Sequence, residues 1–421
     1  MGLTITEKIL ARASGRASVK AGDELRVKPD FVLAYELRGY TDVYFRDMKA
    51  FGAERLREPE RFAIFIDHRV PAKSPEDEAL HVSTRAWCER NGVALFDRAG
   101  IGHQVAAEAG YAVPGSFSVH FDGHVSQLGA FGALAMGLRA DVFEAFVRDG
   151  VTLRVPASTL VRLHGQPRDE VMARDVFHHM LWRHGPRFAA FRVLEYGGDG
   201  LDALGLEGLQ VLTGLAMFTG AVSAVAPPSA AALPRAAANA RIQVPPVWPD
   251  TDAGYVNRID VDLGEVEPMV VLPPSPANAA RLVEHLGIRM DAGYLGSCAS
   301  GRLEDLHAAA RVLKGRSIAS GFSLHVVPTS QAIMAAAAAD GTLGALIEAG
   351  AFVSSPSCDY CSGNIATLAP GQRAVSTGTL NVPGRMGATD ADIYLCSAAT
   401  LAASALEGAL ADPRRYVESA P

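Results

Sequence analysis

Alternating short apolar runs and amphipathic stretches predict a chain in which strands and helices follow one another. Towards the C-terminus, runs typical of strands ("AGYLGS", "GFSLHVVPTS", "AFVSS") alternate with the helical patterns "EDLHAAARVLKG" and "QAIMAAAAADGTLGALIEAG", each of which ends at a glycine. This alternation predicts a parallel sheet covered by helices. Ser275 is a good N-cap before Pro276, so a further helix is expected to begin there.

The first half of the chain has a mixed pattern as well. "RFAIFIDH" and "SFSVHFDGH" are typical of strands that end in polar residues, and "GVTLRVPASTLVRLHG" predicts a hairpin. The apolar stretch "VLTGLAMFTGAVSAVA" is too short and too broken by Gly and Thr to span a membrane, so it is expected to form a buried helix. Thr4 and Glu7 have the spacing of a capping box that opens a helix.

We expect three α/β domains, at residues 1–150, 151–274 and 275–421, of which composition marks the boundary near residue 275. The Pro- and Ala-rich segment at residues 226–250 lacks a periodic pattern and predicts a linker within the second of them.

Composition and charge narrow the class of protein. The 421 residues are 49% hydrophobic and 20% charged, as in ordinary globular proteins. The net charge of −7 argues against nucleic acid as the main partner. Five cysteines are too few, and odd in number, for a disulfide framework, and the N-terminus lacks the pattern of a secretory signal. We therefore expect a cytoplasmic location and no membrane partner.

Three cysteines lie where a site is expected. Cys298 follows one predicted strand, and the C-x-x-C pair Cys358 and Cys361 follows another, so parallel pairing would place them at one edge of the sheet. Their spacing alone fits a redox pair, a zinc site with one added histidine, or an iron–sulfur cluster with an open iron. Cys88 and Cys396 lie in apolar helical patterns and are expected to be core thiols.

Carboxylates and imidazoles also follow predicted strands and Gly-rich turns. They are Asp67 with His68, His103 in "GIGHQV", and Asp122 with His124. A lone histidine is most often a satisfied core residue, but this repetition predicts that the side chains converge on one cleft.

Together these segments resemble the aconitase superfamily, and within it the large subunits of 3-isopropylmalate dehydratases. The similar segments run through nearly the whole chain and include "DHRVP", "GIGHQVAAEAGYAVPGS", "FDGHVSQLGAFGALAMG", "LGSCASGR", "GAFVSSPSCDYCSG" and "GRMGATDADIYLCSAATLAASALEG". The resemblance implies three aconitase-type α/β domains around a cluster cleft, without the fourth, swivelling domain. It implies an iron–sulfur hydro-lyase that adds water to, or removes it from, a 2-hydroxy carboxylic acid.

The resemblance also implies roles for individual residues. Cys298, Cys358 and Cys361 would hold a [4Fe–4S] cluster that keeps one iron without a protein ligand.

In the family, an Asp-His pair that matches Asp67 and His68 protonates the leaving hydroxyl. A histidine that matches His103 pairs with the carboxylate that matches Asp122, and His124 matches a further active-site histidine.

Arg385 matches an arginine that binds a substrate carboxylate. The catalytic base of the family is a serine in a Y-G-x-G-S-S-R-type loop, which this sequence lacks. A separate small subunit is therefore expected as a partner.

Several family positions are changed, mainly around the expected substrate. "CDYC" stands where the family has C-G-P-C, and Gly123 replaces a serine. Thr379 replaces an asparagine and Leu380 replaces an arginine, while Gly214 and Phe218 replace an asparagine and a glutamate.

In "LAYELRGYTD", Tyr35 and Glu36 replace part of a polar substrate-contacting stretch. The departures predict a substrate with fewer carboxylates or a larger apolar group than 3-isopropylmalate. Two alternatives stay open: a non-catalytic, cluster-holding sensor or regulator, and a zinc-binding derivative of the fold.

Overall fold

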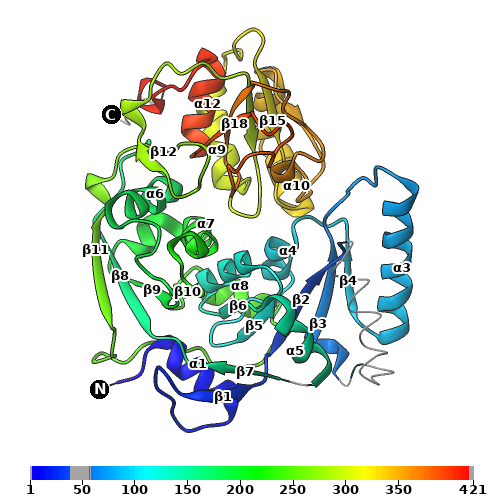
Figure 1. Ribbon diagram of the computed structural model, residues 1–421, viewed down its shortest axis with the longest axis vertical. Coiled ribbons are helices and arrows are strands. Elements are labelled where there is room, and N and C mark those ends of the chain that lie inside the picture. Colours follow the sequence, from blue (N-terminus) through cyan, green and yellow to red (C-terminus); the bar gives the residue numbers. More distant parts are fainter. Residues whose placement is uncertain (1, 38–55, 57, 149, 417–421) are drawn as a thin grey trace. The chain divides into compact units, whose positions relative to one another are not determined.

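The computed structural model describes residues 2–37, 56, 58–148 and 150–416 (Figure 1). The chain divides into two compact units, which are described separately. Unit 1 comprises Met1–His68, Ala72–His164 and Arg187–Val261, and unit 2 comprises Arg69–Pro71, Gly165–Pro186 and Asp262–Pro421. Both contain sheets with parallel strands and helices, so the predicted α/β class is confirmed. The division into three domains stays a prediction.

The main sheet of unit 1 has five parallel strands in the order β4-β3-β2-β5-β6. Their bounds are β2 Phe31–Tyr35, β3 Phe62–Ile66, β4 Ala94–Asp97, β5 Phe117–His120 and β6 Leu134–Gly137. All five residues of β3 are buried, as expected for a central strand of a parallel sheet. The helices of this part are α1 Ile5–Ser14, α3 Pro75–Asn91, α4 Gly102–Glu108 and α5 Val142–Arg148, with the 3₁₀ segment η2 Gly123–Phe131. The capping box at Thr4 is confirmed and begins α1.

The second sheet of unit 1 has the order β10-β9-β8-β11. Its strands are β8 Ser158–His164, β9 Val193–Gly197, β10 Ser223–Val225 and β11 Asn257–Asp262, and its helices are α7 Leu201–Gly214, η4 Ala216–Thr219 and α8 Ala232–Ala238.

Two predictions about this region were wrong. The expected hairpin does not form, because β7 (Val151–Arg154) pairs with β1 (Glu24–Val27) while β8 pairs with β9. The predicted buried helix is divided between the end of α7, η4 and β10, because Gly214 and Gly220 interrupt it.

Unit 2 contains a seven-stranded sheet in the order β13-β12-β18-β17-β14-β15-β16. Its strands are β12 Met269–Val271, β13 Ala279–Arg281, β14 Ala292–Leu295, β15 Ser323–Val326, β16 Phe352–Val353, β17 Arg373–Ser376 and β18 Asp392–Cys396. Strands β14 to β18 are mutually parallel, and β12 and β13 are antiparallel additions at one edge. Its helices are α6 Ala173–His184, α9 Leu303–Leu313, α10 Gln331–Ala339, α11 Thr342–Glu348 and α12 Ala398–Glu407, with the 3₁₀ segment η7 Tyr360–Ser362.

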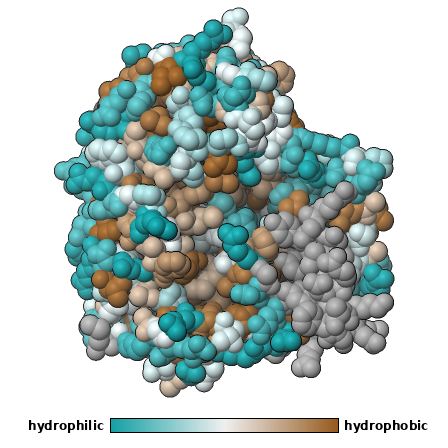
Figure 2. Space-filling model, viewed as in Figure 1, coloured by the Kyte–Doolittle hydropathy of each residue, from teal (hydrophilic) through white to brown (hydrophobic). Residues whose placement is uncertain are grey.

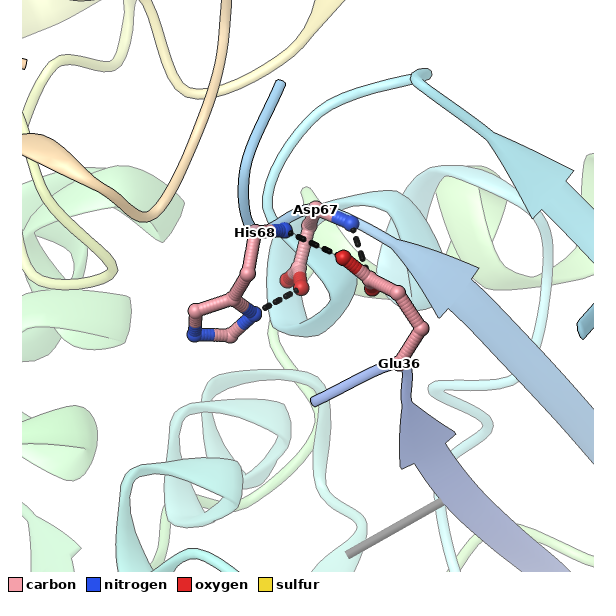
Figure 3. A group of neighbouring side chains, drawn as sticks. All are labelled: Glu36, Asp67 and His68. Carbon is pink, nitrogen blue, oxygen red and sulfur yellow. Dashed lines mark hydrogen bonds and ion pairs between the residues drawn. The ribbon is translucent and has the colours of Figure 1, made fainter. Parts of the chain in front are cut away.

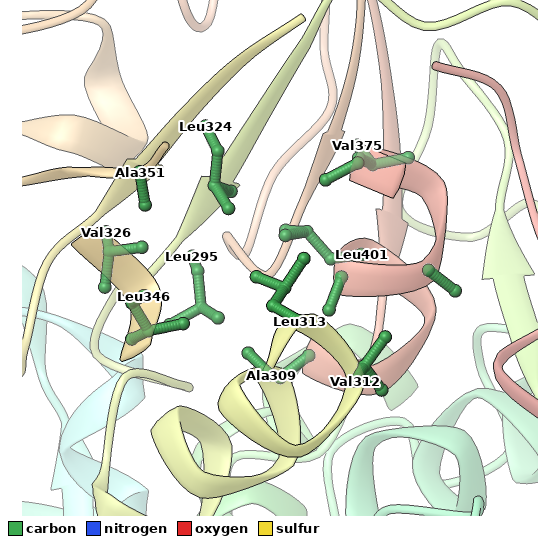
Figure 4. Close-up of a cluster of buried hydrophobic side chains, with 14 of the residues drawn as sticks. Leu295, Ala309, Val312, Leu313, Leu324, Val326, Leu346, Ala351, Val375 and Leu401 are labelled. Atoms are coloured by element: carbon green, nitrogen blue, oxygen red, sulfur yellow. The ribbon is translucent and has the colours of Figure 1, made fainter. Parts of the chain in front are cut away.

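The core of unit 2 lies between this sheet and its helices. Leu313 on α9 and Leu401 on α12 pack with the strand residues Leu295, Leu324 and Val375 (Figure 4). The strands and helices predicted from the alternating pattern are therefore confirmed, except that the segment from Gln331 forms two helices, α10 and α11, which are separated at Gly341. The helix expected after Ser275 is wrong, because the short strand β13 follows instead.

Hydrophilic residues cover much of the face shown in Figure 2, with hydrophobic residues among them. No helix within the described ranges is long and apolar enough to cross a membrane.

Candidate functional site

Three neighbouring strands of unit 1 bring the predicted acids and bases together. Asp67 and His68 directly follow β3, Glu36 follows β2, and Asp122 comes two residues after β5. Because β3, β2 and β5 are parallel and adjacent, these residues lie at one edge of the sheet. The predicted convergence within this unit is what the topology produces.

Asp67 and His68 form a tightly bonded pair. Nδ1 of His68 lies 2.6 Å from Oδ1 of Asp67, and Oδ2 of Asp67 accepts the backbone N–H of Gly102 at 2.7 Å. Asp67 is buried, which alone would raise the pKa of its carboxyl. The His68 ring and the Gly102 N–H outweigh burial and lower this pKa below its ordinary value. The carboxylate therefore stays ionised and holds the imidazole by Nδ1.

Glu36 lies directly behind this pair (Figure 3). Its Oε2 accepts the N–H of Asp67 and its Oε1 accepts the N–H of His68, each at 2.9 Å. Burial raises the pKa of Glu36 to about 7. Sequence reasoning placed Glu36 only in a changed substrate-contacting stretch, of which residues 38–42 lie outside the described residues.

Asp122 and His124 form a second pair. Oδ1 of Asp122 accepts the backbone N–H of His124 at 3.0 Å and lies 3.0 Å from Nδ1 of the same residue. Burial would raise the pKa of Asp122, but the charge and hydrogen bond of His124 hold it well below its ordinary value. The ring of Phe218, from η4, lies 5.7 Å from the His124 ring. The imidazole thus has a carboxylate partner although Phe218 replaces the family's glutamate.

His103 lies on α4, with its ring 5.2 Å from that of His120, and it pairs differently from expectation. Both of its ring nitrogens are buried without a hydrogen-bond partner among the described residues, and Asp122 is bonded to His124 instead. Burial lowers the pKa of His103, while the charge of Asp122 acts in the opposite direction. Two unpaired buried ring nitrogens leave His103 able to bind a polar ligand or water.

Tyr35 and His120 complete the surroundings of these histidines. The Tyr35 ring lies 4.9 Å from the His68 ring and 4.7 Å from the His120 ring. His120, which sequence reasoning missed, hydrogen-bonds the Leu33 carbonyl oxygen at 2.6 Å through Nδ1. Burial and the neighbouring His103 lower the pKa of His120 to about 3, so it is neutral at physiological pH.

The three cysteines lie together in unit 2. Cys298 follows β14, while Cys358 and Cys361 follow β16, and both strands are parallel members of one sheet. Cys298 and Cys361 are buried and Cys358 is partly buried. Nη2 of Arg385 donates to Sγ of Cys361 at 3.1 Å. Burial disfavours the charge of Arg385, but the electrostatic influence of the three cysteines and the hydrogen bond to Cys361 outweigh burial and raise the pKa of Arg385. All four side chains therefore share one site.

The spacing of the three thiolates bears on the group that they could hold. Among the described residues, their Sγ atoms do not all lie within 4.8 Å of one another. Zinc–sulfur bonds of about 2.3 Å in a tetrahedron would bring thiolates to roughly 3.8 Å apart. One zinc ion would therefore require the three side chains to move closer together. Three cysteines are the donor set of a cluster that keeps one iron without a protein ligand, so the residues present fit such a cluster.

The loop that carries Cys298 is held by two buried arginines that sequence reasoning also missed. Arg174, on α6, donates to the carbonyl oxygens of Thr377 and Gly378 at 2.6 and 3.0 Å and to that of Ala299 at 3.4 Å. Arg302 donates to the Cys298 carbonyl oxygen at 2.9 Å. The local sequence of α6 gives no signal for Arg174, because its hydrogen-bond partners are more than a hundred residues away in the chain.

Glycine permits the tight path of this loop. Gly296 and Gly301 have φ values of 128° and 82°, and a Cβ at either position would lie 2.2 or 2.6 Å from the Val327 carbonyl oxygen. The "GSCASG" segment is therefore a close turn around Cys298.

The remaining predicted residues follow β17 or belong to the core. Thr379 is buried and Leu380 is partly buried, in the same loop region that leads to Arg385. Cys88 and Cys396 are buried thiols whose pKa values burial raises, so both stay protonated. Their prediction as core thiols is confirmed, although Cys396 ends a strand and not a helix.

Comparison with known proteins identifies the family. Residues 7–287 and 283–408 match the aconitase family (aconitate hydratase). The chain is 36% identical to the 3-isopropylmalate dehydratase large subunit 1 of Methanopyrus kandleri, covering 99% of this chain and 100% of that protein. It is 37% identical to the homoaconitase large subunit of Thermus thermophilus, covering 99% of each. A crystal structure of aconitase X from Thermococcus kodakaraensis aligns with a TM-score of 0.48 at 10% identity, over 90% of this chain and 93% of that one.

Two relatives with different substrates in their names are thus about equally similar to this chain. Overall identity does not choose between those substrates, whereas the family itself follows from matches over nearly the whole sequence. The chain belongs to the aconitase family and is an enzyme of its hydro-lyase class.

Proposed function

We propose that this chain is the large subunit of an iron–sulfur hydro-lyase that acts on a 2-hydroxy carboxylic acid other than 3-isopropylmalate. The observation that supports it most is the grouping of Cys298, Cys358 and Cys361 around Arg385. Three thiolates beside one cation match the donor set of a cluster that leaves one iron without a protein ligand. The same residues would hold a [4Fe–4S] cluster. When bound, the cluster would supply a Lewis-acidic iron for the substrate hydroxyl.

Arg385 would bind a carboxylate of the substrate. Its charge is maintained despite burial, and its Nε is buried without a hydrogen-bond partner among the described residues. A guanidinium with an unused donor is suited to a carboxylate oxygen. Leu380 adds no second cation, which supports a substrate with fewer carboxylates than the family's usual ones. Thr379 lies in the same loop as Arg385 and would also contact the substrate.

Asp67 and His68 would deliver the proton to the leaving hydroxyl. With Nδ1 bonded to the ionised Asp67, the His68 ring presents Nε2 as the atom that carries the transferable proton. His103 and the pair of Asp122 and His124 would orient the substrate through ring nitrogens near the same edge of the sheet. These side chains would orient the substrate and protonate its leaving hydroxyl.

Aromatic side chains would shape the substrate preference. Phe218 lies beside His124, and Tyr35 lies beside His68, so each of these histidines has an aromatic neighbour. An apolar substituent on the substrate would pack on such rings at a gain of about 25 cal/mol per Å² of buried surface. The proposed substrate therefore carries an apolar group near its hydroxyl.

A separate small subunit would supply the missing base. The relatives are named as large subunits, and the printed sequence contains no Y-G-x-G-S-S-R-type segment. We also propose a cytoplasmic location, because cluster assembly and free thiolates require reducing conditions, and we retain the three-domain division as part of this proposal.

Anaerobic purification followed by iron, sulfide and zinc analysis tests the cofactor. Three variants, Cys298→Ala, Cys358→Ala and Cys361→Ala, are each expected to lose iron. The matched variant Cys88→Ala, which removes a protonated core thiol, is expected to retain it. Zinc at one equivalent without sulfide would contradict the cluster and favour the zinc derivative.

Turnover with a co-expressed small subunit tests the reaction. Malates with hydrogen, isopropyl or benzyl substituents at C3 are offered, and formation of the unsaturated acid is followed by ultraviolet absorbance. The aryl-substituted acid is expected to give a higher kcat/KM than 3-isopropylmalate. An iron-loaded complex that dehydrates none of the three acids would contradict the proposal that the substrate is a substituted malate.

A further inference from the structure

A buried carboxylate and a buried histidine lie behind the Asp67–His68 pair. Glu36 is 1% exposed, and its two oxygens accept the N–H groups of Asp67 and His68 (Figure 3). His81, on α3, is also 1% exposed. Its Nε2 lies 3.4 Å from Oε1 of Glu36 and 3.2 Å from the His68 carbonyl oxygen. His81 therefore contacts both the carboxylate and the backbone that carries His68.

The charged groups that face Glu36 come from two elements. His81 lies on α3, and Asp67 and His68 follow β3. On the far side of His81, Nδ1 lies 3.6 Å from Oε2 of Glu78, whose side chain is 43% exposed. This separation is longer than a hydrogen bond, and Nδ1 of His81 has no hydrogen-bond partner among the described residues, so Glu78 acts on the pair only through its charge.

A metal ion is a poor occupant for this cluster. Ligand atoms of Glu36, Asp67 and His68 lie within 4.8 Å of one another, which is close enough to share an ion. All four carboxylate oxygens, however, already accept hydrogen bonds or face the His68 ring. The geometry favours a proton over a metal.

Two buried carboxylates so close together cannot both be ionised without a compensating charge. Asp67 is compensated by His68. Burial raises the pKa of Glu36 to about 7, and the hydrogen bond to Glu36 raises the pKa of His81. Nε2 of His81 lies 3.4 Å from Oε1 of Glu36, close enough for the two atoms to share one proton. The pair changes from carboxylate with imidazolium to carboxylic acid with neutral imidazole, and no other atom is exchanged.

We propose that Glu36 and His81 form a proton-sharing pair that positions His68 and sets the pH range over which His68 carries its proton. When Glu36 takes the proton, one acceptor oxygen becomes a hydroxyl and the negative charge that faces His68 disappears. Both changes disfavour the protonated ring. Glu36 and His81 are positioning residues, and their role in catalysis rests on the proposed function of His68 as the general acid.

Histidine NMR titration of the full chain, purified anaerobically with its metal content, tests the pair directly. In Glu36→Gln, the titration midpoint of His68 is expected to move to lower pH by about 0.5–1 unit. His81→Gln is expected to move it in the same direction, because Glu36 then loses its cation, and this second variant serves if the first does not fold. An unchanged His68 midpoint in the variant that folds would overturn the proposal.

A matched control separates this role from general destabilisation. Glu195 is also 1% exposed and accepts the backbone N–H groups of Ile5 and Thr6 at 3.1 Å. Glu195→Gln is expected to leave the His68 midpoint unchanged, and an equal shift in this variant would overturn the proposal.

Activity of the complex with the small subunit gives a second readout. Glu36→Gln is expected to move the pH limb at which kcat falls, with KM nearly unchanged. A wild-type complex without turnover, together with a shifted His68 midpoint in Glu36→Gln, would reject the proposed function and keep the pair. Turnover in both chains with identical pH profiles would reject the catalytic role of the pair and keep the function.

Discussion

Replacing Arg174 by methionine should loosen the loop at Thr377 and Gly378. The Cys298 loop should loosen with it, because the Gly296 N–H and the Ser297 hydroxyl both donate to Thr377. The guanidinium makes two good hydrogen bonds, to the carbonyl oxygens of Thr377 at 2.6 Å and Gly378 at 3.0 Å, and a weaker one to Ala299 at 3.4 Å. A hydrogen bond to a charged group contributes about 1.5–3 kcal/mol, so the two good bonds contribute roughly 3–6 kcal/mol. Burial lowers the pKa of Arg174, which shows that its charge is costly to bury. Removing that charge offsets part of the loss and leaves a net cost of about 2–4 kcal/mol.

Hydrogen–deuterium exchange measures this cost where it arises. A local loss of about 3 kcal/mol corresponds to a roughly 100-fold faster exchange of amides that open with the loop. Peptides that cover residues 296–302 and 377–381 are expected to show it, and iron release into a chelator should accelerate in parallel. Peptides that cover β3, in unit 1, should not change.

The control is Arg162→Met, which removes an arginine that is 44% exposed and paired with Asp260 at 2.7 Å. Such surface pairs contribute little, so this variant should exchange like the wild type. Acceleration of less than tenfold in residues 377–381, where the two stronger bonds are lost, would refute the reasoning, and so would equal acceleration with Arg162→Met.

Three further predictions concern unit 1. Phe218→Glu places a carboxylate beside His124, which should raise the pKa of this histidine. The same change should lower kcat/KM for apolar substrates at least tenfold. Equal kcat/KM values of the variant for apolar and polar substrates would contradict this prediction. Asp122→Asn should lose roughly 1–3 kcal/mol at pH 7. The folded-state pKa of Asp122 lies well below its ordinary value, so the wild type loses this stability only as the pH falls below about 4. A plot of melting temperature against pH should therefore be flatter for the variant over that range. The raised pKa of Glu36 has the opposite effect on stability. Between pH 4.5 and about 7 the folded chain binds more protons than the unfolded chain, so the contribution of Glu36 to stability falls as the pH rises. Glu36→Gln should remove this slope of stability against pH.

The sequence predicted the elements that position the site because strand ends carry a local signal. Asp67 and His68 come directly after an uninterrupted apolar run, and Cys298 follows another, so their place at a sheet edge needs only the local pattern and parallel pairing. The same reasoning failed for the predicted hairpin. Strand β7 pairs with β1, more than a hundred residues earlier, and no local pattern specifies so distant a partner.

The residues that support the site could not be predicted for a related reason. Glu36 and His81 are ordinary polar residues in the sequence, and they become important only because folding buries both beside Asp67. Arg174 is distant in sequence from the loop that it holds. Candidate site residues that directly follow a strand can be predicted from a single sequence. The buried residues that hold them in place cannot, because they depend on contacts between distant segments.

The change from C-G-P-C to "CDYC" shows how such contacts alter the interpretation of a substitution. In the sequence, Asp359 is only a carboxylate that departs from the family pattern between Cys358 and Cys361. In the structure, Asp359 is fully buried and its carboxylate accepts the Val70 N–H at 3.2 Å, the Ser357 hydroxyl at 2.9 Å and the Asn364 amide at 3.3 Å. Tyr360 packs in a buried hydrophobic cluster. A carboxylate with this many donors stabilises the turn of the loop, because no acceptor oxygen is left unsatisfied. Asp359 therefore fixes the turn between Cys358 and Cys361 through its own hydrogen bonds, and the substitution does not disrupt the loop that carries both cysteines.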